Sequence, residues 1–262
     1  MTTQESSTPI LTIDGPRADI RFNRPDKLNR IEPAALAALD RHLDAIESDP
    51  ALRVVVLTGT GRVFGAGYHI GDLDEQHSGT RTPTGDEVDF ETVANRLEGC
   101  PLPTICRLNG SVYGGSTDLA LACDFRIGVA GTEMVMPAAR LGTHYYQGGI
   151  ERYVTRLGVG AAKRLFMASV PQSSEEMVRI GFLDEAVPAE ELDARVDALA
   201  ARLARNAPLA VRNMKRAMNQ IAVNRLDVEA FRAGYEACQQ SQDFREGVRA
   251  WKEKRTPVFE GR

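Results

Sequence analysis

The chain has 262 residues, 43% of them hydrophobic, and this size suits one large domain or one domain with a small appendage. Its formal net charge is −4, its isoelectric point is near 5.7 and no basic face stands out, so nucleic acid is not expected as a partner. The N-terminal MTTQESSTP lacks the basic and apolar regions of a signal peptide, and no window approaches the roughly 18 apolar residues of a membrane span. These features predict a cytoplasmic protein without membrane contact.

The four cysteines lie in apolar contexts without paired spacing, at Cys100, Cys106, Cys123 and Cys238. We expect each to act as a small buried hydrophobic residue in a reducing compartment. No two histidine, cysteine or carboxylate positions repeat at the spacing of metal ligands, so the sequence predicts no metal site.

The first half of the chain predicts short strands and helices in a repeated strand–strand–helix pattern. Apolar runs indicate the strands, and leucines at helical spacing after Pro33 indicate the first helix. Polar residues 73–86 predict a loop near the mouth of a site. The expected elements of this half are strands at 10–13, 18–22, 53–59 and 103–108 and helices at 33–48, 88–100 and 116–123.

The second half is predicted to be mostly helical, and residues 137–149 are expected to be irregular, ending in Gly148-Gly149 before a helix. The last helices have apolar stripes but no convincing core of their own, so packing on a neighbouring molecule is the simpler explanation. The expected elements here are strands at 124–129, 133–136 and 182–187 and helices from 150 and at 160–168, 174–180, 189–206, 207–223, 226–240 and 243–254.

Residues 104–124, TICRLNGSVYGGSTDLALACD, predict a buried strand, a glycine turn and the N-terminus of a buried helix. The free N–H groups at such a helix end suit an anion or a developing oxyanion, and glycine lets a ligand approach the backbone. Taken alone, the Gly114-Gly115 pair is more simply explained as an ordinary tight turn that needs positive φ. A phosphate-binding loop is disfavoured, because the glycine spacing differs and no Lys-Ser/Thr follows.

Four motifs together resemble the enoyl-CoA hydratase/isomerase (crotonase) superfamily. A second strand-to-glycine unit, RVVVLTG followed by FGAGYHI at 64–70, is similar to the family's first oxyanion loop, and NGSVYGGSTDLA at 109–120 is similar to its second. NRPDKLNRI at 23–31 and REGVRAWKEKRTPVF at 245–259 resemble the family's two terminal motifs. The resemblance covers roughly residues 12–259, with the motifs in family order.

The resemblance implies an α/β, crotonase-like (ClpP/crotonase) spiral of repeated β-β-α units. Residues 1–200 would form the core with the active site, and residues 201–262 a C-terminal helical oligomerisation region. It also implies an acyl-CoA substrate, no cofactor beyond the coenzyme A moiety of that substrate, and assembly as a homotrimer or as a hexamer made from two trimers.

For the catalytic site, the resemblance places two backbone N–H donors to the thioester oxygen on Tyr68 and Gly115. Two glutamates hold the water in hydratases of the family; the first corresponds to Asp118 here and the second to Ala138. The alanine removes one partner of the two-carboxylate acid–base pair. This departs from an ordinary hydratase and also weakens an isomerase assignment. Asp118 alternatively complements the helix dipole.

Within the family, GSVYGGSTDL and the segment around Tyr145 look most like methylmalonyl-CoA decarboxylase. That enzyme also lacks the second glutamate, has a tyrosine at the position of Tyr145, and has a histidine where this chain has Tyr68. Here the histidine comes one residue later, at His69. Packing for Tyr145, and a backbone bond within the loop for His69, remain alternatives.

Coenzyme A contacts are implied by the resemblance at backbone and side-chain positions from both ends of the chain. Tyr235 and Lys254 match an aromatic residue and a lysine that reach the nucleotide, in some family members from the next subunit. A solvated helical charge is the alternative for Lys254. The implied positions are Lys27, Leu28, Ala66, Tyr68, Ile70, Gly114, Gly115, Tyr235 and Lys254.

The sequence hypothesis is therefore an acyl-CoA enzyme that stabilises a thioester enolate and acts as an atypical lyase. Malonyl-type decarboxylation, or hydration of an unusual substrate with Asp118, ranks above isomerisation. A non-catalytic acyl-CoA binding protein that keeps the fold and the loops is the alternative from another class.

Overall fold

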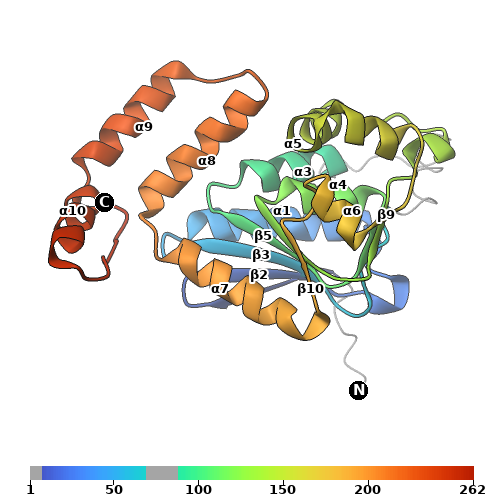
Figure 1. Ribbon diagram of the computed structural model, residues 1–262, viewed down its shortest axis with the longest axis horizontal. Helices are drawn as coiled ribbons and strands as arrows, with labels where there is room; N and C mark the ends of the chain where they lie inside the picture. Colours follow the sequence, from blue (N-terminus) through green and yellow to red (C-terminus); the bar gives the residue numbers. More distant parts are fainter. Residues whose placement is uncertain (1–7, 69–87) are drawn as a thin grey trace.

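The structure, a computed structural model, describes residues 8–68 and 88–262 (Figure 1). The loop expected at 73–86 lies outside the described residues. Strands β1 to β10 form two sheets, and helices cover both faces of the larger one. The strands and helices alternate through the first part of the chain, as the α/β pattern of the sequence predicts.

The larger sheet has six strands, and all of its neighbours are parallel except the first pair. Its hydrophobic strands β3 and β5 lie in the middle, as expected for a sheet covered on both faces. In spatial order the strands are β1 (Ile10–Asp14), β2 (Arg17–Phe22), β3 (Val54–Gly59), β5 (Thr104–Leu108), β7 (Phe125–Val129) and β10 (Glu185–Val187).

The smaller sheet pairs the short strands that follow β3, β5 and β7 along the chain. Its first three strands are parallel and the last is antiparallel. The strands are β4 (Val63–Gly65), β6 (Ser111–Tyr113), β8 (Glu133–Val135) and β9 (Gln172–Ser173). Each repeat therefore contributes one strand to the larger sheet and one strand to the smaller sheet, which is the physical basis of the repeated pattern.

Helices follow the strand pairs and then dominate the C-terminal part. The helices are η1 (Pro25–Lys27), α1 (Pro33–Ser48), α3 (Phe90–Gly99), α4 (Gly115–Ala122), η2 (Ala138–Leu141), α5 (Gln147–Phe166), α6 (Ser174–Arg179), η3 (Ala189–Glu191), α7 (Leu192–Ala204), α8 (Pro208–Ala222), α9 (Val228–Gln240) and α10 (Gln242–Glu253).

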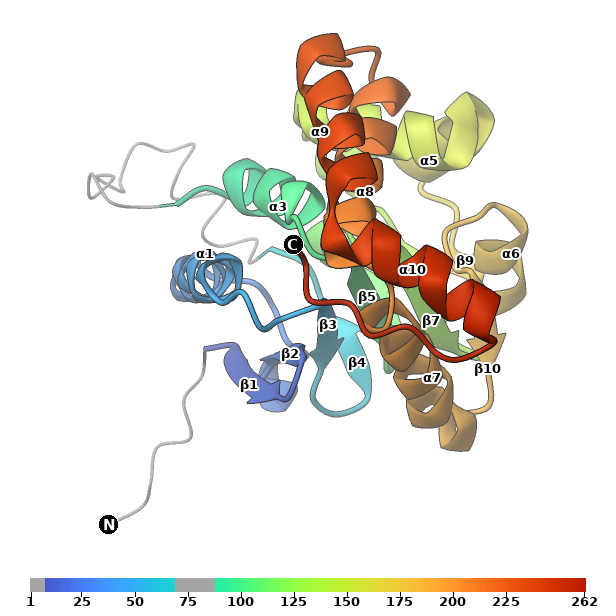
Figure 2. The ribbon, with the colours of Figure 1, turned by 90° about the vertical axis from the view of Figure 1, so that its left-hand side faces the viewer.

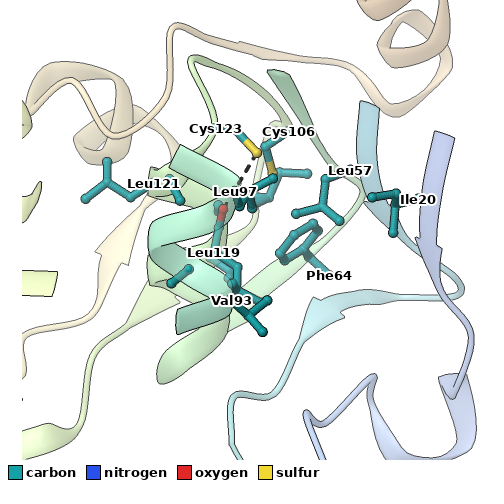
Figure 3. Packing of buried hydrophobic residues seen from close by; sticks show 14 of the residues in the cluster. Ile20, Leu57, Phe64, Val93, Leu97, Cys106, Leu119, Leu121 and Cys123 are labelled. Atoms are coloured by element: carbon teal, nitrogen blue, oxygen red, sulfur yellow. Dashed lines mark hydrogen bonds between the residues drawn. The ribbon is translucent and has the colours of Figure 1, made fainter. Parts of the chain in front are cut away.

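Successive side chains of the central strands point to opposite faces of the larger sheet and therefore belong to two different hydrophobic clusters. In β3, Val55 and Leu57 face the main core with α1, α3 and α4, whereas Val54 and Val56 face the smaller cluster under α7. Figure 3 shows the main core, where Phe64 packs between strand residues and α4. Because α4 is buried almost all round, its N-terminus is fixed firmly against the sheets.

Helices α8, α9 and α10 form an arm that extends away from the sheets (Figures 1 and 2). A buried lysine anchors its first helix, because the ammonium of Lys215 lies 2.7 Å from the carboxylate of Asp124 and donates to the carbonyl of Leu102 at 2.9 Å. The chain then folds back onto α10, where the Asp243 carboxylate accepts the N–H groups of Glu260 and Gly261. The C-terminal motif thus closes the arm on itself.

Three details of the sequence prediction were wrong. Strands β4, β6 and β9 were not predicted, because strands of two or three residues carry too little apolar pattern. Helix α5 begins at Gln147, before Gly148-Gly149, and not at residue 150. Gly158, with φ 81°, breaks it close to the start of the second helix expected at 160–168. Residues 182–184 precede the strand β10, because the N–H groups of Phe182 and Leu183 donate to the carbonyl of Met177 in a turn after α6.

Cys100, Cys106 and Cys123 are buried as free thiols, as predicted, whereas Cys238 is only half-buried. Burial raises the pKa of the Cys106 thiol, which keeps it protonated and inert. Across residues 8–68 and 88–262, no helix is long and apolar enough to cross a membrane.

Candidate active site

The two glycine loops meet at the N-terminus of α4. A Cβ built on Gly67 would lie 2.9 Å from the carbonyl oxygen of Tyr113 and 3.0 Å from the backbone nitrogen of Gly115. One built on Gly65 would lie 2.3 Å from Oγ of Ser116, which also accepts the Gly67 N–H at 3.0 Å. Only glycine permits this approach of one backbone to the other.

Positive φ angles also require glycine at the contact. Gly67 has φ 85°, and Gly114, the N-cap of α4, has φ 51° and ψ −133°. A side chain at either position would strain the backbone. The Gly114-Gly115 pair is therefore more than an ordinary tight turn, because the conformation of Gly114 and the close approach of Gly67 both require the absence of a side chain.

The backbone amides of Tyr68 and Gly115 lie next to each other across this contact. A Cβ on Gly115 would be 3.7 Å from the backbone nitrogen of Tyr68. Gly115 is the first residue of α4, where N–H groups have no acceptor within the helix and carry the positive end of its dipole. The resemblance assigned two N–H donors to these residues, and the structure brings their backbone amides close to each other.

Two asparagines hold the turns that shape this contact. The Asn29 side chain donates to the carbonyls of Thr60 and Val63, and Asn109 accepts the N–H of Gly59 and donates to Gly61. Asn29 of the NRPDKLN motif and Asn109 of the NG motif therefore tie the end of β3 to the turn that leads into the first glycine loop.

Asp118 lies on α4 and is fully buried, with both of its oxygens engaged. Oδ1 accepts from Nη1 of Arg152 at 2.6 Å. Oδ2 accepts from the hydroxyls of Tyr145, at 3.2 Å, and Tyr146. The side chains of Asp118 and Arg152 are 0% exposed, so removing either partner would leave a buried charge and cost roughly 3–5 kcal/mol.

A second carboxylate continues this network outward. Nη2 of Arg152 donates to Asn95 at 2.9 Å and to Glu98 at 3.1 Å, and Glu98 also accepts from Arg156 at 3.0 Å. The network joins α3, α4 and α5, and its two carboxylates balance its two guanidinium groups. The charge of Asp118 is thus matched inside the protein, away from solvent.

Burial and the charge of Asp118 raise the pKa values of Tyr145 and Tyr146 well above their usual range. Both hydroxyls therefore stay protonated at neutral pH and donate to the carboxylate. Burial alone would lower the pKa of Arg152, but the charges of Asp118 and Glu98 raise it instead. The arginine is a permanent cation in this network.

Ala138, at the expected position of the second glutamate, is buried in η2 and offers no proton-transferring group. His69 and Ile70, which complete the first loop, lie outside the described residues. The structure brings Tyr145 to Asp118, and its hydroxyl donates to that carboxylate. His144 next to it is exposed, and its ring bonds the carbonyl of Tyr145 at 2.7 Å.

The expected coenzyme A positions fall into two groups. Leu28, with φ 53°, presents its carbonyl to the N–H of Ala66 at 2.9 Å, so the segment of Lys27 and Leu28 lies beside the first glycine loop. Tyr235 is 59% exposed on α9, and Lys254 ends α10. These two belong to the C-terminal arm that extends away from the sheets (Figure 1).

Sequence reasoning missed Arg152, the charged partner of Asp118. Arg152 follows Gly148-Gly149 in a helix that has arginines on several faces, and nothing in the sequence separates the buried one from the others. Phe90 opens α3 directly after residues without a readable pattern. Its ring atoms would lie 3.1 and 3.2 Å from a Cβ on Gly115, at the N-terminus of α4.

Comparisons with known proteins agree with this geometry. The family model described as enoyl-CoA hydratase/isomerase matches residues 16–262. A short-chain-enoyl-CoA hydratase of Clostridium acetobutylicum is 30% identical over 254 residues, covering 96% of this chain and 97% of that protein. A 1,2-epoxyphenylacetyl-CoA isomerase of Escherichia coli is 30% identical over 247 residues, covering 93% and 94%.

The crystal structure of an enoyl-CoA hydratase from Bacillus anthracis superimposes with a TM-score of 0.86 at 29% identity, covering 97% of this chain and 99% of that one. This likeness confirms the α/β, crotonase-like fold expected from the sequence, and fold and family match together define an acyl-CoA enzyme. The chain belongs to the enoyl-CoA hydratase/isomerase (crotonase) family. Its relatives at similar identity carry hydratase and isomerase names, so identity alone does not choose the reaction.

The first turn of α5 provides a test of the tyrosine packing. A Cβ on Gly149 would lie 2.3 Å from Cε1 of Tyr145, whereas one on Gly160 in the same helix meets nothing within 4 Å. We expect Gly149→Ala to lower the free energy of unfolding by about 1–3 kcal/mol. Gly160→Ala is the control and should raise it by roughly 0.5–1 kcal/mol, measured by urea unfolding. Equal effects at the two positions would contradict this packing.

Proposed function

We propose that this enzyme is an atypical acyl-CoA lyase that stabilises a thioester enolate without a two-carboxylate pair. The observation that carries the proposal is the pairing of the Tyr68 and Gly115 amides beside a carboxylate whose oxygens are both engaged. One oxyanion donor typically supplies roughly 3–4 kcal/mol of barrier reduction. Two amides at this point support the backbone part of the proposed site, whereas Ala138 leaves the side-chain pair of a hydratase without its second carboxylate.

Decarboxylation of a malonyl-type thioester makes the smallest demand on a free base. The C–C bond to the carboxylate breaks, CO2 leaves, and the electron pair moves onto the thioester oxygen, where the two amides stabilise it. The enolate carbon then takes up one proton. Tyr145 and His69 are the proposed donors, and the raised pKa of Tyr145 keeps its hydroxyl protonated.

The other reactions make larger demands on Asp118. Hydration of an unusual substrate would require it to activate water while it is bonded to Arg152 and two tyrosines. Isomerisation would require it to move a proton between two carbons. A non-catalytic acyl-CoA binding protein is the second candidate, and the full engagement of Asp118 is the observation that favours it.

The proposed coenzyme A contacts begin where Lys27 and Leu28 lie beside Ala66, and the thioester would end at Gly114 and Gly115. Ile70, Tyr235 and Lys254 complete the proposed set, the last two reaching the nucleotide of a neighbouring subunit. We expect no cofactor beyond the coenzyme A moiety itself.

We also propose that residues 201–262 form an oligomerisation region on a core of residues 1–200, in a homotrimer or a hexamer of two trimers. Apolar side chains are exposed on all three helices of the arm, and they would be buried by a neighbouring subunit. They include Met214, Met218, Ile221, Phe231, Phe244 and Trp251, which is 86% exposed.

The reaction can be tested by assaying crotonyl-CoA hydration and methylmalonyl-CoA decarboxylation in parallel. We expect decarboxylation to exceed hydration, because one of the two carboxylates of a hydratase is missing. Asp118→Asn should lower decarboxylation about 10²-fold, since it disturbs the tyrosines near the reacting carbon. Strong hydration that persists in Asp118→Asn would overturn the proposal. Tight acyl-CoA binding without turnover across a broad thioester panel would favour the non-catalytic candidate.

The proposed role of the Gly115 N–H as an oxyanion donor can be tested with two variants of that residue. Gly115→Pro and Gly115→Ala both add a Cβ toward Phe90, but only proline removes the N–H, and proline is well tolerated at the first position of a helix. We expect kcat of the proline variant to lie about 10²–10³-fold below that of the alanine variant, with similar melting temperatures. Equal kcat values would show that this amide does not hold the oxygen.

The assembly can be tested by analytical ultracentrifugation. The wild-type protein should sediment as a trimer or hexamer, and Trp251→Glu should shift it toward smaller species, because a charge would be placed in a buried interface. Ile13→Glu, on the edge strand β1 and 49% exposed, is the control that should leave the mass unchanged. A wild-type monomer at micromolar concentration would refute the assembly.

A further inference from the structure

Four aromatic side chains from separate parts of the chain form a continuous row, which we call the aromatic row: Tyr68, Phe90, Tyr146 and Tyr145. The ring centroids of Tyr68 and Phe90 are 6.4 Å apart, and those of Phe90 and Tyr146 are 6.0 Å apart, both edge to face. Tyr146 and Tyr145 stack at 4.7 Å. These distances are those of favourable aromatic pairs.

The row begins at the oxyanion site. Tyr68 contributes one of the two amides through its own backbone, and the Phe90 ring lies within 3.2 Å of the Cβ position of Gly115, which contributes the other. An acyl group whose carbonyl oxygen is held between those amides starts at this point. Among the described residues, Phe90 is therefore a side chain that lies close to the start of such a group.

The residues of the aromatic row are only partly buried, so part of their ring surface remains accessible. All four residues pack against the main core, yet each is only half-buried. The hydroxyls of Tyr145 and Tyr146 are directed to Asp118, and Arg152 matches that charge. The charges of Asp118 and Arg152 are thus matched with each other, and the rings of the two tyrosines offer apolar surface to a ligand.

We propose that the acyl group of the substrate carries a planar aromatic ring, which packs against Phe90 and the neighbouring rings of the aromatic row. The inference rests on the proposed function, because it takes the thioester oxygen to lie at the Tyr68 and Gly115 amides. A planar ring gains edge-to-face or offset-stacked contacts that a puckered saturated ring of the same size cannot make. Aromaticity, rather than hydrophobicity alone, sets the preference.

The test compares two thioesters that differ only in the ring, phenylacetyl-CoA and cyclohexylacetyl-CoA. Phenylacetyl-CoA is also the product that loss of CO2 from phenylmalonyl-CoA would give. Isothermal titration calorimetry on the wild-type protein should give a dissociation constant about three- to tenfold lower for the phenyl compound. The coenzyme A part is common to both ligands, so the ratio reports on the acyl group alone.

Phe90→Leu should bring this ratio close to one. Phe125→Leu is the matched control, because Phe125 is also a half-buried phenylalanine but packs in the smaller cluster under α7. It should keep the wild-type ratio. Melting temperatures of both variants verify that they fold, and the wild-type ratio is informative without any variant.

Equal affinity of the wild-type protein for the two thioesters would overturn the inference, and so would an equal loss of preference in Phe125→Leu and Phe90→Leu. Failure of the inference and failure of the proposed function are distinguishable. Turnover without ring preference would remove only the inference. Ring preference without any turnover would remove the lyase proposal and leave the inference standing.

Discussion

The close contact between two glycine loops is the constraint on which the site depends. Gly67 lies so near the backbone of Tyr113 and Gly115 that a side chain at this position would separate the two loops. Ser116 and the two motif asparagines hold the same arrangement from behind. In the proposed oxyanion site the donors are backbone groups, so the site would tolerate change in nearly every surrounding side chain, and a family can vary its chemistry around such a site.

The buried pair of Asp118 and Arg152 is the second determinant. In a low-dielectric interior a carboxylate needs a partner, and here a guanidinium and two phenol hydroxyls satisfy it. The same contacts that stabilise the charge occupy the lone pairs that acid–base catalysis would use. Together with Ala138, they separate this site from one that works with two free carboxylates.

The two ends of the chain bear on the site in different ways. The Leu28 carbonyl is bonded directly to the first glycine loop, so the N-terminal motif shapes the site within the subunit. The arm of α8 to α10 is anchored by Lys215 but otherwise extends from the sheets with apolar side chains exposed (Figure 2). Such a surface is costly in water unless it is covered.

The sequence by itself determined the repeated elements, the two glycine loops and the departure at Ala138, because periodicity, glycine and motif order are local properties. It did not determine which arginine of α5 is buried, nor that Phe90 reaches Gly115, since both contacts join segments far apart in the chain. It also gave no sign that Asp118 is fully engaged. Burial and pairing of a charge depend on which helices meet, and only the tertiary structure decided that.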